Sequence, residues 1–399
     1  MIEEKIAYHA DKGEIVPTRD MLKTIPQIEG IQKSADLNTA VLDHVAAHIH
    51  AGMSTAEIDK LVYDYTTEHG GIPAPLNYQG FPKSVCTSIN NEICHGIPDE
   101  NIILEEGDII NVDVSTILGG YFSDASRMFM IGKVSERAER LVRVTQECVE
   151  LGLAQAKPWN HLGDIADAIN THAKENGYSV VEEIGGHGVG LEFHEEPWVS
   201  YVTPKGSEML LVPGMIFTIE PMINEGSPEF FVDEDNDWTV YTEDDGLSAQ
   251  VEYMVRITDD GAVVMNDNYN GLDAEAREKI QSFLKQQEEK EQKTPPQQQT
   301  STPIGQKQPP QQKRKEPELA NWQKVMDNGE YLRSAEMAEE ANYNMIDGLM
   351  NNVRKVKDKD KPRESVLAKL RLNQKKVAKQ GKKQTQQKAM TEDMERKKK

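Results

Sequence analysis

Residues 109–131 read IINVDVSTILGGYFSDASRMFMI, two apolar, strand-like runs joined by a turn around Leu118-Gly119-Gly120. The first run carries Asp113 and the second carries Asp124. A turn centred on Leu118-Gly119 sets the two aspartates directly opposite each other, whereas a turn centred on Gly119-Gly120 makes them diagonal neighbours. Both registers put the two carboxylates on one face, because side chains alternate across a strand. The stretch therefore predicts an antiparallel hairpin that holds two acidic groups close together.

Three more polar residues interrupt sequence that otherwise looks like a buried core. Glu220 follows the run Ile-Phe-Thr-Ile, Glu252 divides a second apolar run, and His187 stands among the glycines of residues 185–190. A buried carboxylate is costly unless it is paired or bound to a metal, and close like charges need a proton, a cation or solvent. With Asp113 and Asp124, these residues make four carboxylates and one imidazole. That donor set suits a pair of divalent ions better than one structural zinc.

Further along the chain, the apolar pattern predicts more strands and two pairs of helices. Runs bounded by Gly, Pro or acidic clusters predict strands at Val85–Ile89, Met215–Ile223 and Gln250–Ile257. Helical periodicity predicts longer helices near 28–50 and 136–156 and shorter ones near 54–70 and 160–177. The shorter helices align at one offset, with Glu57 matching Asp164 and Gly70 matching Gly177. We therefore expect an α+β fold with an antiparallel sheet backed by these helices. The common offset suggests two related halves, each with two helices followed by strands, and the alternative is a chance likeness between amphipathic helices.

Composition limits the classes of protein to which the chain can belong. Its 399 residues include 37% hydrophobic side chains, enough for a sizeable core. Three cysteines, Cys86, Cys94 and Cys148, are too few for a disulfide framework and predict a reducing compartment. The sequence shows no basic leader before an apolar stretch and no run of about 18 apolar residues, so neither export nor membrane insertion is expected. These features predict a cytoplasmic protein with no membrane partner.

Charge divides the chain into unlike parts. From Pro295 onward it carries 24 Lys and Arg against 14 Asp and Glu, while the preceding residues carry 21 basic and 53 acidic side chains. The acidic front repels phosphates, which argues against nucleic-acid binding there. We predict a folded domain over 1–285, a Gln/Pro-rich flexible linker over 286–316, and a basic, partly helical tail over 317–399, with helical character at Leu319–Met350 and Ser365–Val377. The sequence does not identify the partner of the tail, because its net positive charge is compatible with both the ribosome and RNA.

Several short motifs resemble one family in order and in spacing. They are Cys94-His95-Gly96-Ile97-Pro98, Asn111-Val112-Asp113-Val114, Ser123-Asp124-Ala125-Ser126-Arg127-Met128-Phe129, Gly186-His187-Gly188-Val189-Gly190 followed by Phe193-His194-Glu195-Glu196-Pro197, and Phe217-Thr218-Ile219-Glu220-Pro221-Met222. From about residue 25 to 265 the sequence resembles the type I methionine aminopeptidases. The resemblance implies the pita-bread fold, in which two related αβ halves surround a curved antiparallel sheet, and makes residues 1–285 the catalytic domain.

Carried over position by position, the resemblance implies a dinuclear metal site. Asp124 and Glu252 would bridge two divalent ions. Asp113 would hold one of these ions, and His187 with Glu220 would hold the other. Mn, Fe, Co and Zn all suit such a site, because carboxylate-rich ligand sets discriminate little among them. Two ions about 3.5–4 Å apart acidify a water between them and polarise the scissile carbonyl.

The same resemblance assigns residues that would meet the substrate. Glu220 would take and return a proton, His194 would stabilise the oxyanion, and His95 would bind the backbone near the scissile amide. The methionine side chain would lie in a pocket lined by Tyr78, Phe81, Cys86, Phe193 and Trp238. The implied activity is removal of the initiator methionine from nascent polypeptides with a small second residue. The implied partner is the N-terminal Met of these peptides. For the whole chain we further expect a monomer that contacts the ribosome.

Two positions depart from the family pattern, and two other functions compete. Tyr253 stands where the family commonly has His after the last Glu ligand, a change that bears on metal affinity. Pro75 stands where a Cys often borders the pocket. A proline-specific aminopeptidase or prolidase shares the fold, although the Cys94-His95-Gly96 run fits it poorly. The other alternative is a non-catalytic pita-bread protein that binds nascent chains or ribosomes, although such relatives typically lose metal ligands.

Overall fold

The computed structural model describes residues 2–266, 282, 285, 343–344 and 349–350. The helices of this part are α1 (Ile2–Asp11), α2 (Ile25–Ala46), α3 (Thr55–Glu68), α4 (Glu136–Gln155) and α5 (Leu162–Glu175), with short 3-10 turns η1 (Arg19–Met21) and η2 (Tyr78–Gly80). The expected helices are therefore present, with ends that differ by a few residues. Thr24 caps α2 together with Gln27, and a proline lies in its first turn, which explains the earlier start.

The strands of the described residues pair antiparallel throughout, as expected. They are β1 (Ile72–Pro73), β2 (Cys86–Ile89), β3 (Glu92–Cys94), β4 (Ile109–Leu118), β5 (Tyr121–Met130), β6 (Ser179–Val180), β7 (Gly186–Gly188), β8 (Glu195–Val199), β9 (Ile216–Ile219), β10 (Met222–Asn224), β11 (Phe230–Val232), β12 (Val240–Thr242), β13 (Ser248–Gln250), β14 (Tyr253–Ile257) and β15 (Ala262–Val264). β4 pairs with β1, β2 and β5, and a five-stranded sheet runs β15-β14-β9-β7-β8. Two smaller sheets are β13-β10-β6 and β11-β12-β3.

The β4–β5 hairpin turns at Gly119-Gly120. Both glycines have positive φ, 61° and 85°, a backbone conformation that other residues rarely adopt. The register pairs Asp113 with Ser126 and Ser115 with Asp124. The two aspartates are therefore diagonal neighbours on one face, which confirms the second of the two predicted registers.

The two predicted αβ halves have matching helices. α5 begins 107 residues after α3, from Thr55 to Leu162, and both helices contain 14 residues. An acidic residue three positions into each helix accepts the N–H of the capping residue, Glu57 in α3 and Asp164 in α5. A glycine with positive φ follows each helix, Gly70 and Gly177. The sequence offset therefore corresponds to a repeated local structure.

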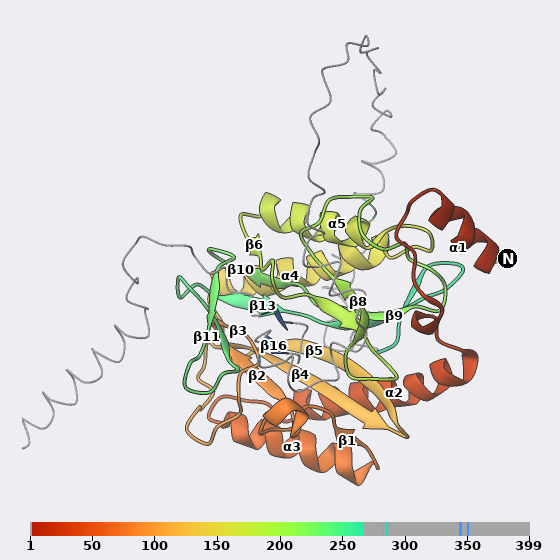
Figure 1. The fold of residues 1–399 in the computed structure, drawn as a ribbon. Coiled ribbons are helices and arrows are strands. Elements are labelled where there is room, and N and C mark those ends of the chain that lie inside the picture. The colour runs from red at the N-terminus through yellow and green to blue at the C-terminus, as the bar shows by residue number, and fades with distance from the viewer. Residues whose placement is uncertain (1, 267–281, 283–284, 286–342, 345–348, 351–399) are drawn as a thin grey trace, which may run out of the picture. The chain divides into compact units, whose positions relative to one another are not determined.

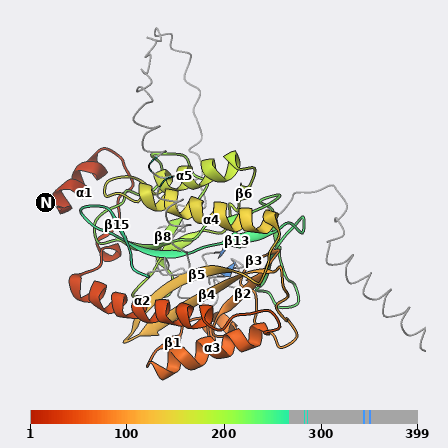
Figure 2. The same cartoon turned by 180° about the vertical axis from the view of Figure 1, so that it is seen from behind.

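The helix pairs cover the strands from opposite sides. α4 and α5 lie over one side and α2 and α3 over the other in both views (Figures 1 and 2). Leu141 and Ile165 are fully buried in the core that α4 and α5 form with β9 and β14, and Leu42 and Ile58 are fully buried with the apolar face of β4 and β5. Burying such a side chain contributes about 1.5–3 kcal/mol. Because side chains alternate along a strand, the face of the hairpin that carries the two aspartates turns away from α2 and α3.

The apolar runs at 215–223 and 250–257 each form two strands instead of the one expected. β9 ends before Glu220 and β10 begins after Pro221, which has no N–H to donate to a ladder. Ile219 pairs with Tyr253 on one side of the break and Met222 pairs with Gln250 on the other. The register is the same on both sides, so Glu220 lies opposite Glu252.

The predicted tail is described at four residues only. Tyr343–Asn344 and Leu349–Met350 pair as short antiparallel strands, β16 and β17, so the helix expected over Leu319–Met350 is wrong at these positions. The intervening Asp347-Gly348, a dipeptide typical of hairpin turns, is a sequence signal that favours strands here. The other predicted tail segment and the linker lie outside the described residues. Within the described part, none of the helices has the length and apolar character needed to cross a membrane.

Candidate active site

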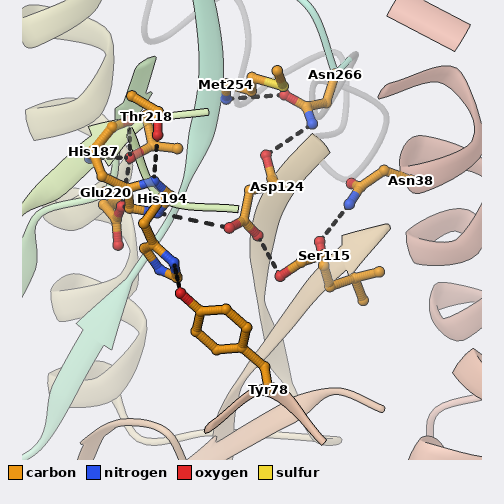
Figure 3. A network of polar contacts seen from close by, with 12 residues as sticks. Asn38, Tyr78, Ser115, Asp124, His187, His194, Thr218, Glu220, Met254 and Asn266 are labelled. Carbon is orange, nitrogen blue, oxygen red and sulfur yellow. Dashed lines mark hydrogen bonds and ion pairs between the residues drawn. The ribbon is translucent and has the colours of Figure 1, made fainter. Parts of the chain in front are cut away.

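Three buried side chains converge where the two halves meet. Atoms of Asp124, His187 and Glu252 that can bind a metal lie within 4.8 Å of one another. The imidazole Nε2 of His187 is 3.7 Å from Asp124 Oδ2 and 3.7 Å from Glu220 Oε1 (Figure 3). A bridge between Ser126 and Glu252 joins β5 to the segment between β13 and β14. This bridge and the paired strand break bring candidates from distant parts of the sequence together.

Hydrogen bonds orient the imidazole and one glutamate. The Nδ1 atom of His187 lies 3.0 Å from the carbonyl of Gly188 and donates to it, so that the other ring nitrogen, Nε2, faces the carboxylates. The hydroxyl of Thr218 accepts the N–H of His187 at 3.0 Å and donates to Glu220 Oε1 at 2.5 Å. Gln250 donates to the other oxygen of Glu220 at 3.1 Å. One threonine therefore positions two of the candidate ligands.

Asp124 is held through both its side chain and its backbone. Ser115, on the neighbouring strand, donates to its Oδ1 atom at 2.8 Å. Asn266 donates to the backbone carbonyl of Asp124 at 2.9 Å and accepts the N–H of Met254 at 2.9 Å, which links β5 to β14 (Figure 3). The carboxylate is thus aimed at His187 by contacts on two sides.

The chemistry of the five candidates fits divalent cations. Their exposed fractions are 4% or less: Asp113 4%, Asp124 2%, His187 3%, Glu220 0% and Glu252 2%. Buried carboxylates cost several kcal/mol each unless they are paired or bound to a metal, and Asp124 and Glu220 both lie 3.7 Å from the single imidazole of His187. Carboxylate oxygens with one imidazole nitrogen are ligands that Mn²⁺, Fe²⁺, Co²⁺ and Zn²⁺ accept. A cationic occupant would balance the charge that these side chains concentrate.

His194 lies beside this cluster as a neutral imidazole. Its ring centroid is 4.2 Å from that of His187, and its Nδ1 atom is 3.1 Å from the hydroxyl of Tyr78 (Figure 3). Burial lowers the pKa of His194 well below its usual value, and the nearby His187 and His95 lower it further. Burial also raises the pKa of Tyr78 to about 12, which keeps the phenol protonated. Tyr78 can therefore donate to Nδ1, so that Nε2 of His194 carries the proton.

His95 and the predicted pocket residues lie close together. His95 is fully buried with a φ of 57°, a strained conformation for a residue other than glycine, and its ring centroid is 6.3 Å from that of Trp238. Trp238, Phe81, Cys86 and Tyr78 belong to one apolar cluster. Phe193 joins them through its ring contact with Tyr78, at 4.8 Å between centroids. The structure thus gathers all five predicted pocket residues.

Sequence reasoning missed Ser115, Thr218 and Gln250, which donate to the candidate ligands. Each lies two positions from a candidate on the same run, Ser115 after Asp113, Thr218 before Glu220 and Gln250 before Glu252. Residues two apart share a face of a strand, so this period of two is the sequence signal that could have identified them.

The two departures from the family pattern lie beside the site. The hydroxyl of Tyr253 accepts from Gln146 at 2.6 Å and donates to Glu150 at 2.9 Å, both on α4. Tyr253 therefore points into the helix layer, on the opposite side of the chain from the preceding Glu252. Pro75 is buried, and its carbonyl accepts the N–H of Tyr78 at 2.9 Å, at the start of η2.

Comparison with known proteins gives consistent matches. The family model of metallopeptidase family M24 matches residues 29–260. Methionine aminopeptidase A of Synechocystis sp. is 46% identical over 239 residues, which cover 60% of this chain and 94% of that protein. Methionine aminopeptidase of Escherichia coli K12 is 43% identical over 245 residues, covering 61% and 92%. The crystal structure of methionine aminopeptidase from Rickettsia prowazekii has a TM-score of 0.60 at 39% identity, covering 61% and 98%.

The chain belongs to metallopeptidase family M24, because the family model spans more than half of it. Within that family it lies with the methionine aminopeptidases and has their pita-bread fold, as its motifs predict. A second family model, a domain of unknown function (DUF4316), matches residues 328–371. That match falls inside the predicted tail, outside residues 29–260 that the M24 family model matches.

Proposed function

We propose that this protein removes the N-terminal methionine from nascent polypeptides with a small second residue. The observation that carries the proposal is the buried cluster of Asp124, His187 and Glu252, with Glu220 3.7 Å from His187, in a chain that covers nearly the whole length of methionine aminopeptidases. Asp113, Asp124, His187, Glu220 and Glu252 would together hold two divalent ions.

Bound there, the ions would supply Lewis acidity that activates water and polarises the scissile carbonyl. Glu220 is suited to accept a proton and return it to the leaving amine, because Thr218 and Gln250 fix both of its oxygens. His194 would donate its Nε2 proton to the oxygen that gains charge. His95 would hold the substrate backbone beside it.

The substrate side chain would contact the aromatic cluster. Tyr78, Phe81, Phe193 and Trp238 with Cys86 offer an apolar, polarisable surface, and a methionine thioether packs favourably against aromatic rings. Recognition of an apolar terminal residue therefore fits this cluster. Trp238 follows an acidic stretch at 233–237, which adds negative charge near the place where a protonated N-terminus would approach.

We further propose a monomeric, cytoplasmic enzyme that uses Mn, Fe, Co or Zn. Three reduced cysteines and the nascent-chain substrate favour this location. Residues 1–285 would form the catalytic domain, 286–316 a linker, and 317–399 a basic tail that contacts the ribosome or another partner. The charge contrast between the acidic front and the basic tail supports this division.

The test compares metal-reconstituted hydrolysis of Met-Ala-Ser and of an Ala-Pro peptide by wild type and His187→Ala. We expect release of methionine from the first peptide only, two bound ions per chain in the wild type, and loss of both properties in His187→Ala. His50→Ala, at an exposed histidine, is the matched control and should behave as wild type. Release of alanine would favour a proline-specific enzyme. No turnover with any divalent metal would favour a non-catalytic binding protein.

A further inference from the structure

A buried ion pair joins the N-terminal segment to the loop that carries His194. The ammonium of Lys23 donates to Glu195 Oε2, and the exposed fractions of the two side chains are 1% and 14%. Lysine is rarely buried unless it is paired. The two residues are 172 positions apart, so this contact fixes a long-range arrangement and not a local turn.

The partner carboxylate also binds the loop backbone. Glu195 Oε1 accepts the N–H of Leu191 at 2.5 Å and the N–H of Glu192 at 3.1 Å. One carboxylate therefore holds one ammonium and two consecutive amides. Residues 191–195 form a closed turn whose remaining members are Phe193 and His194, both candidate site residues.

The backbone of Lys23 is held by contacts to two other elements of the fold. The N–H of Lys23 donates to the carbonyl of Gly214 at 2.9 Å, shortly before β9 begins. The next residue, Thr24, caps α2. Lys23 is thus anchored between the helix layer and the strand that precedes Glu220, and η1 packs against β8 beside it. The Lys23–Glu195 ion pair therefore restrains the turn of residues 191–195.

We infer that Lys23 is a positioning residue, which acts through Glu195 to set His194 and Phe193 against the metal cluster and the aromatic cluster. Without the ammonium, the carboxylate loses its countercharge and can turn toward water, and the two amides lose their acceptor. His194 lies one peptide bond from Glu195, and its ring is 4.2 Å from that of His187. A misplacement of about 1 Å at such a site costs up to about a hundredfold in rate. This inference rests on the proposed function for its catalytic consequence, but not for the structural role of the pair.

The test uses the full chain with Lys23→Met, which keeps the length of the side chain without its charge, and Lys23→Arg, which restores the charge. Lys33→Met, on the exposed side of α2, is the matched control. We expect Lys23→Met to lower kcat for Met-Ala-Ser by about tenfold or more, with KM changed by less than about threefold. Bound metal per chain should equal that of the wild type. Lys23→Arg should recover most of the rate, and Lys33→Met should match the wild type.

A second measurement does not depend on activity. Amide hydrogen exchange in the segment 190–194 should become about tenfold faster in Lys23→Met and in Glu195→Gln, with the β4–β5 hairpin unchanged. Unchanged kcat and unchanged exchange in Lys23→Met would overturn the inference, as would a loss of rate that follows a loss of bound metal. If Lys23→Met does not fold, wild-type rate and exchange in Glu195→Gln would overturn it. If the wild type releases no methionine, the proposed function fails, and the exchange measurement alone decides the role of Lys23.

Discussion

Replacing Glu92 with glutamine should stabilise the protein in a manner that depends on pH. Glu92 lies on β3, where its Oε2 atom accepts the N–H of Ile89 at 2.8 Å and its Oε1 atom accepts the hydroxyl of Tyr241 at 3.1 Å. Burial is the main cause that raises the pKa of Glu92 from 4.5 to about 7, while these hydrogen bonds oppose the rise. The folded state therefore holds a proton on Glu92 over a pH range in which the unfolded chain has lost it.

The sign and size of the effect follow from that difference. Between pH 4.5 and 7 the folded state binds more protons, so the free energy of unfolding is highest below pH 4.5 and falls until the pH passes 7. A shift of this size corresponds to about 3 kcal/mol. Glutamine cannot ionise, and its carbonyl can still accept the N–H of Ile89. Glu92→Gln should therefore gain less than about 1 kcal/mol at pH 5 and about 3 kcal/mol at pH 8.

Urea unfolding of metal-free wild type and Glu92→Gln at pH 5, 6, 7 and 8 measures this difference. Glu100→Gln, at an exposed acidic residue, is the control and should shift the free energy of unfolding equally at all four values. Parallel stability curves for wild type and Glu92→Gln would refute the reasoning. A gain that is larger at pH 5 than at pH 8 would refute its sign.

Three other substitutions test contacts around the candidate site. Tyr253→Phe removes the hydroxyl that bonds two side chains of α4 and should cost about 1–3 kcal/mol in urea unfolding, with bound metal unchanged. Gly186→Ala should lower stability by about 1–3 kcal/mol and weaken metal binding in calorimetric titration, because its Cβ would lie 2.6 Å from the carbonyl oxygen of Thr218. Tyr78→Phe should lower kcat by up to about tenfold with little change in thermal stability, because His194 loses its phenol partner; an unchanged kcat would contradict this role.

The sequence could predict the acidic hairpin because two independent patterns agreed. Alternation placed Asp113 and Asp124 on one face whichever register formed, and the Gly119-Gly120 pair located the turn within two residues. Glu220 and Glu252 were identifiable because each interrupts an apolar run. The strand breaks at these two residues were not predicted. A carboxylate inside an apolar run indicates that its burial costs free energy, but it does not show whether the strand continues through it. Pro221, which has no N–H to donate to a strand ladder, was the sequence signal for the break between β9 and β10.

Long-range contacts could not be predicted from such local sequence patterns. The pairing of Lys23 with Glu195 spans 172 positions and leaves no periodic trace in either segment. The helix expected over Leu319–Met350 was wrong at its four described residues because helical spacing outweighed the hairpin signal of Asp347-Gly348. Roles assigned to the site residues stay predictions, whereas the convergence of Asp124, His187, Glu220 and Glu252 in space is a property of the fold.

The candidate ligands are divided between the two halves of the fold, and this division would affect how a metal-binding protein matures. Asp113 and Asp124 belong to the first half, while His187, Glu220 and Glu252 come from the second. A chain still being synthesised would carry the acidic hairpin long before Glu252 emerges, so tight metal loading by this set of ligands would have to wait until residues 1–252 are made. Once bound, the ions would tie the halves together and stabilise the folded state by mass action. Metal occupancy would then report that folding of this domain is complete.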